Sequence, residues 1–143
     1  SLDATVTEII VDGGVIEPEI TALDFGRFSC LKSLKIGDHC FSYVEKVKLV
    51  GLKMLESVVI EMESFTKKIN DHGNDPNRHF VLKNCPSLKK LEIGYDSFSD
   101  YTVCEIEKVD ALETISIGPM DGIGACFYSA SLELKSEIVE SER

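Results

Sequence analysis

Apolar residues recur along this chain at a fixed spacing. Four segments share the pattern Leu-x-x-(Leu/Val/Ile)-x-Ile, and they begin at Leu31, Leu55, Leu88 and Leu112. Successive leading leucines are 24, 33 and 24 residues apart, which indicates a period of 24 with one insertion of nine residues. A sequence that repeats itself at such a period is typical of a stacked repeat architecture.

Each repeat extends on both sides of its leading leucine. Apolar residues lie eight, six and three residues before it and three, five and ten residues after it, and Gly122 is the single exception among the four repeats. Positions two residues apart share one face of an extended strand, so each repeat predicts two short strands. One repeat has only one apolar face, and stacking buries these faces together. No sustained apolar stripe of helical spacing occurs, so we expect little helix.

The pattern also sets the limits of the repeats. A partial unit begins at Val6, and Leu132 and Leu134 copy the apolar pair that precedes each leading leucine. We therefore expect about five coils over residues 6–134, in a single domain that spans residues 1–143. Residues 66–79 form the predicted inserted loop and residues 135–143 a charged tail. Because Ser1 is not a natural start, we expect the chain to be a fragment of a longer protein.

The strand pattern resembles that of leucine-rich repeat proteins. The run from Val81 to Gly94, which reads VLKNCPSLKKLEIG, is similar to the Treponema-type or BspA-like class of these repeats. The resemblance implies a mainly β, leucine-rich-repeat-like solenoid with two short strands per coil, which binds other macromolecules without catalysis. The chain departs from the class in having Gly or Glu after the strand in place of proline. It also lacks the usual ladder of Asn or Cys, whose approximate place is taken by His39, Glu63, Asp96 and Met120.

Charge and cysteine content narrow the choice of partners and compartments. The net charge of −10 repels phosphate backbones, and no stretch is long and apolar enough to span a bilayer, so we expect neither nucleic acid binding nor membrane insertion. The five cysteines show no zinc-like clustering and cannot all pair within the chain. We expect reduced, buried thiols, which slightly favour an intracellular protein. The family resemblance leaves a surface-exposed protein open.

The outward residues of the main predicted sheet lie two and four residues after each leading leucine. They form the face that a protein partner would meet, although a merely solvated sheet face has the same polar character. The residues that we predict to bind a partner on this face are Ser33, Lys35, Ser57, Val59, Lys90 and Glu92.

The insertion is the one locally basic stretch of the chain. Its Gly, Pro, Asn and Asp residues predict turns and no strand, and insertions in repeat proteins are often loops on a binding face. An inert polar loop is the simpler alternative. The loop residues that we predict to bind a partner are Lys67, Lys68, His72 and Arg78.

Catalytic signals are weak. Asp71, His72, Asp75 and His79 match no standard metal spacing, and no nucleophile–base arrangement or phosphate-binding glycine loop occurs. We therefore expect a non-catalytic protein-binding module without metal or cofactor. The alternative is a structural spacer, or a segment that self-associates through the open edges of its sheets.

Overall fold

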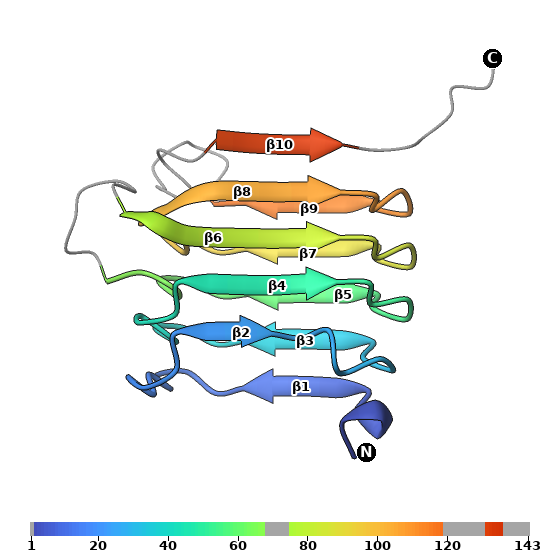
Figure 1. The fold of residues 1–143 in the computed structure, drawn as a ribbon, viewed down its shortest axis with the longest axis horizontal. Helices are drawn as coiled ribbons and strands as arrows, with labels where there is room; N and C mark the ends of the chain where they lie inside the picture. Colours follow the sequence, from blue (N-terminus) through green and yellow to red (C-terminus); the bar gives the residue numbers. More distant parts are fainter. Residues whose placement is uncertain (1, 68–74, 119–130, 136–143) are drawn as a thin grey trace.

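The strands form two parallel sheets in the computed structural model, which describes residues 2–67, 75–118 and 131–135 (Figure 1). The odd-strand sheet contains β1 (Glu8–Val11), β3 (Ser33–Ile36), β5 (Ser57–Ile60), β7 (Lys90–Ile93) and β9 (Thr114–Ile117). The even-strand sheet contains β2 (Ala22–Asp24), β4 (Lys46–Val50), β6 (Asp75–Lys83), β8 (Tyr101–Glu107) and β10 (Ser131–Lys135). The only helix in the described residues is a 3₁₀ turn, η1 (Leu2–Thr5), so the prediction of a mainly β fold with little helix is confirmed for this part of the chain.

Successive strands alternate between the two sheets, and within each sheet the strands follow chain order. The strands of one sheet run opposite in direction to those of the other (Figure 1). Equivalent repeat positions are directly paired: Leu34 with Val58, and Val58 with Leu91. In the even-strand sheet Leu132 of β10 pairs with Cys104 of β8, as the C-terminal copy of the pattern predicts.

The hydrophobic core lies between the two sheets. The inward side chains of β3, β5 and β7 are at most 2% exposed, because the even-strand sheet and the turns cover them. The equivalent residue on the edge strand β9, Ile115, is 47% exposed. The core is therefore dense in its middle layers and partly open where the odd-strand sheet ends.

The turns after β3, β5 and β7 each contribute one aromatic ring to a stack. The rings of Phe41 and Phe65 lie 5.6 Å apart, and those of Phe65 and Phe98 are stacked at 4.7 Å. All three have a positive φ, between 54° and 59°, which a bulky residue adopts only when its surroundings enforce it. Burial of the stacked rings holds this backbone conformation. The Phe ten residues after each of these leading leucines therefore fixes the turn in which it lies.

A ladder of small polar side chains lies just inside the Phe stack. Each side chain donates a hydrogen bond to a carbonyl of the preceding repeat: the Cys40 thiol to Asp12 O at 3.2 Å, the Ser64 hydroxyl to Gly37 O at 2.7 Å, and the Ser97 hydroxyl to Glu61 O at 2.5 Å. The backbone N–H of Ser64 in turn donates to Ser97 Oγ at 3.0 Å. The prediction that the chain lacks such a ladder is therefore wrong.

The ladder lies one residue later than the sequence suggested. His39, Glu63 and Asp96 are not buried, whereas the residue that follows each of them is buried. Met120, the fourth member of the expected row, lies outside the described residues.

Strand β6 begins inside the stretch that we expected to form only turns. It starts at Asp75 and pairs with Tyr101 of β8, and its register shifts before His79 pairs with Val103. Pro76 lies within this shift, where its missing N–H interrupts no regular ladder. The loop prediction for 66–79 is therefore wrong at its C-terminal end, because the ladder of the neighbouring strand extends the sheet through turn-favouring residues.

Candidate partner-binding face

The outward face of the odd-strand sheet brings together all six of its predicted residues. Ser33, Ser57 and Lys90 form one row across β3, β5 and β7, because each is paired in register with the next. A second row, two residues further along each strand, consists of Lys35, Val59 and Glu92. Ile10 on β1 continues this second row and is 59% exposed.

Two ion pairs cross this face. Lys35 Nζ lies 3.3 Å from Glu61 Oε1, and Lys90 Nζ lies 3.6 Å from Glu92 Oε2. Each side chain in these pairs is between 39% and 52% exposed, so water competes for every charge. Exposed single pairs of this kind contribute about 0–1 kcal/mol, so they can exchange partners at little cost.

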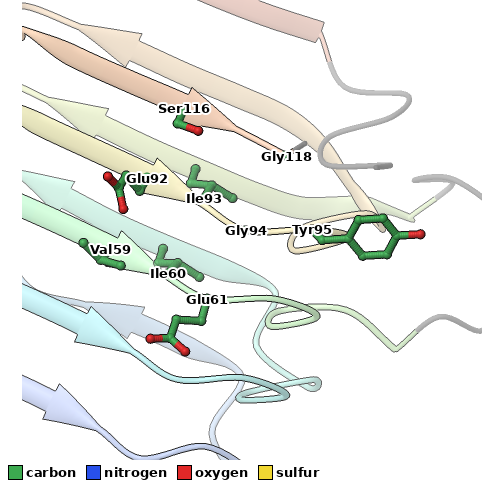
Figure 2. Close-up of a pocket in the computed structure, with 9 residues that line it drawn as sticks. All are labelled: Val59, Ile60, Glu61, Glu92, Ile93, Gly94, Tyr95, Ser116 and Gly118. Atoms are coloured by element: carbon green, nitrogen blue, oxygen red, sulfur yellow. The ribbon is translucent and has the colours of Figure 1, made fainter. Parts of the chain in front are cut away.

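A shallow groove of about 380 Å³ runs along this face where β5, β7 and β9 end. Val59, Glu92 and Ser116 line it from the strands, and Glu61 and Tyr95 line it from the turns (Figure 2). A smaller hollow of about 240 Å³ lies at the same edge of the sheet, beside β1 and β3. Hollows therefore lie along most of the row formed by the carboxyl ends of the odd strands.

Glycines at the ends of β3 and β7 allow the backbones of successive turns to pack closely. A Cβ atom on Gly94 would lie 2.8 Å from the carbonyl carbon of Glu61, and one on Gly37 would lie 2.7 Å from Gly13 N. No side chain fits at either place, because the backbones of successive repeats are in contact there. The groove wall at Gly94 is consequently bare backbone.

Two exposed side chains beside the groove were missed by the sequence analysis. Met62 and Tyr95, which are 44% and 37% exposed, each lie seven residues after a leading leucine. Tyr95 O accepts a hydrogen bond at 2.7 Å from the backbone N–H of Glu63, which ties the two turns together. Both residues occupy the same position within their repeats, and this was the available signal. A residue in a turn follows no strand alternation, so its position does not predict where its side chain points.

The predicted loop residues do not form one exposed basic patch. Lys67 is exposed, and its ammonium group lies 5.1 Å from the centre of the Tyr43 ring. Lys68 and His72 lie outside the described residues. Arg78 is only 1% exposed, so its prediction as a surface contact is wrong.

The position of Arg78 in β6 explains its burial. It lies two residues before the buried Phe80, and strand alternation directs both side chains inward. Its guanidinium donates to Ser42 O at 3.0 Å and lies 5.7 Å from the centre of the Tyr101 ring. The buried guanidinium is therefore partnered by protein groups. It links the start of β6 to the start of β8 and to Ser42.

The outward face of the even-strand sheet has a different electrostatic organisation. Lys83 Nζ lies 2.8 Å from Glu105 Oε2 and 3.1 Å from Glu107 Oε2, so one ammonium bridges two carboxylates. The hydrogen bonds that Lys83 donates to Glu105 and, with a smaller effect, to Glu107 raise the pKa of Lys83 above its usual value. Both carboxylates therefore already have a close cationic partner.

Groups with catalytic potential are not assembled into a site in the described residues. No cluster of three metal-ligating side chains occurs there. His39 Nε2 lies 3.6 Å from Glu63 Oε2 across two turns, and His79 Nε2 contacts Pro76 O at 3.0 Å. Burial raises the pKa of the Cys85 thiol and that of the Cys104 thiol, the latter to about 12, so both stay protonated. Of the predicted thiols, Cys40, Cys85 and Cys104 are buried, Cys30 is half-buried and Cys126 lies outside the described residues.

Comparisons with known proteins add no family to this description. No protein-family model matches the chain, and no curated protein or solved structure matches it either. Within the part of the chain that the structure describes, no helix is long and apolar enough to cross a membrane.

Proposed function

We propose that this chain is a leucine-rich-repeat-like solenoid that acts as a non-catalytic protein-binding module. Its partner binds to the outward face of the odd-strand sheet. The observation that carries the proposal is the groove of about 380 Å³ at the carboxyl ends of β5, β7 and β9. It combines the half-buried Val59 and the exposed Tyr95 with charges held in weak pairs, and a transient protein interface favours such a mixture.

The two rows of predicted residues support this assignment. They lie on rigid strands, so their side chains are held in place before a partner arrives, and less conformational entropy is lost on binding. The exposed Met62 and Tyr95 add flexible and aromatic contact area beside them. Arg78 is removed from the binding set because it is buried, and Lys67 is retained as a peripheral contact.

Charge-swapped pairs test the proposal without removing any ion pair. One variant carries Lys35→Glu with Glu61→Lys and Lys90→Glu with Glu92→Lys, which reverses the pattern on the face but keeps both attractions. The control exchanges two exposed, register-paired residues of the even-strand sheet, Asp24→Lys with Lys48→Glu. Neither variant changes the net charge.

Pull-down from a lysate of the source cells, read by mass spectrometry, compares the three proteins. We expect a partner that the wild type and the even-strand control recover equally and that the odd-strand variant loses. Circular dichroism and thermal unfolding verify that all three are folded. Equal recovery by all three proteins, or recovery of the chain alone, would contradict binding through this face.

Self-association is the second candidate function. Its support is Ile115 of the edge strand β9, which occupies a core-facing position and is nevertheless 47% exposed. Edge strands with uncovered apolar positions favour pairing with a further strand. Sedimentation velocity over a range of concentrations tests this. The spacer hypothesis predicts oligomers that Ile115→Lys abolishes, whereas the binding-module hypothesis predicts a monomer in both proteins.

A further inference from the structure

We draw no further inference here: the strongest candidate, the outer edge of strand β9 with its exposed Ile115, belongs to the self-association already considered, and nothing in the described part of the chain shows what covers it.

Discussion

The two outward faces of this molecule come from the same repeat but differ in how their charges are arranged. On the even-strand face Lys83 bridges two carboxylates at 2.8 and 3.1 Å. On the odd-strand face Lys35 and Lys90 each form one longer, more exposed pair. The odd-strand face is also hollowed along its carboxyl edge. The difference shows that one repeat can arrange Lys and Glu side chains as a compact cluster on one face and as separate, more exposed pairs on the other.

Substitution of a crowded glycine should give the largest difference in stability between variants of the two sheets. Gly94→Ala places a methyl group 2.8 Å from a backbone carbonyl carbon, and we expect it to lower the free energy of unfolding by about 1–3 kcal/mol. Gly26→Ala, just after β2, meets the movable Asp24 Oδ1 at 3.1 Å and Val50 O at an ordinary 3.6 Å, and should cost less. Urea unfolding of both variants measures this difference. Equal losses would show that the contact between repeats at Gly94 is not tight.

The inner side of the even-strand sheet carries a titratable group where the odd-strand sheet has Leu, Val and Ile. Burial raises the pKa of Cys104 to about 12 from 9.0, so the unfolded chain loses this proton first as the pH rises. The stabilising effect is complete below about pH 9 and is lost by about pH 12, at about 1.4 kcal/mol per pH unit in between. The stability difference between wild type and Cys104→Ala should therefore shrink from pH 9 to pH 11. Parallel urea-unfolding profiles would contradict this burial.

Removing one lysine from each face should give a smaller difference. Lys35→Met breaks a single exposed pair and should change the free energy of unfolding by less than about 0.5 kcal/mol. Lys83→Met leaves Glu105 and Glu107 close together without their shared cation, so its thermal midpoint should fall further. The gap between the two midpoints should narrow in 1 M NaCl, because salt screens the repulsion. Identical midpoints at low salt would mean that the two faces do not differ electrostatically.

Much of the fold could be predicted because the repeat positions its own side chains. The columns around each leading leucine fixed which residues pair, and the two outward rows of the odd-strand sheet lie together as predicted. Arg78 was predicted on the surface because it is charged, but its position two residues before Phe80 places it on the buried face of β6. Its guanidinium donates to a carbonyl there, which makes its burial tolerable. The small polar ladder and the exposed Met62 and Tyr95 were missed because they lie in turns whose neighbouring residues have a positive φ, and such turns do not follow strand alternation. The groove itself depends on tertiary packing that no single repeat encodes.

Hydroxyl-radical footprinting of the chain, alone and with its captured partner, tests the central claim most directly. Three oxidisable side chains have similar exposure: Met62 and Tyr95 lie in the turns that follow β5 and β7, whereas Met54 lies in the turn between β4 and β5. Binding through the odd-strand face predicts that Met62 and Tyr95 become protected and that Met54 keeps its rate of oxidation. Unchanged rates at Met62 and Tyr95 in the complex would contradict the claim that this face binds the partner.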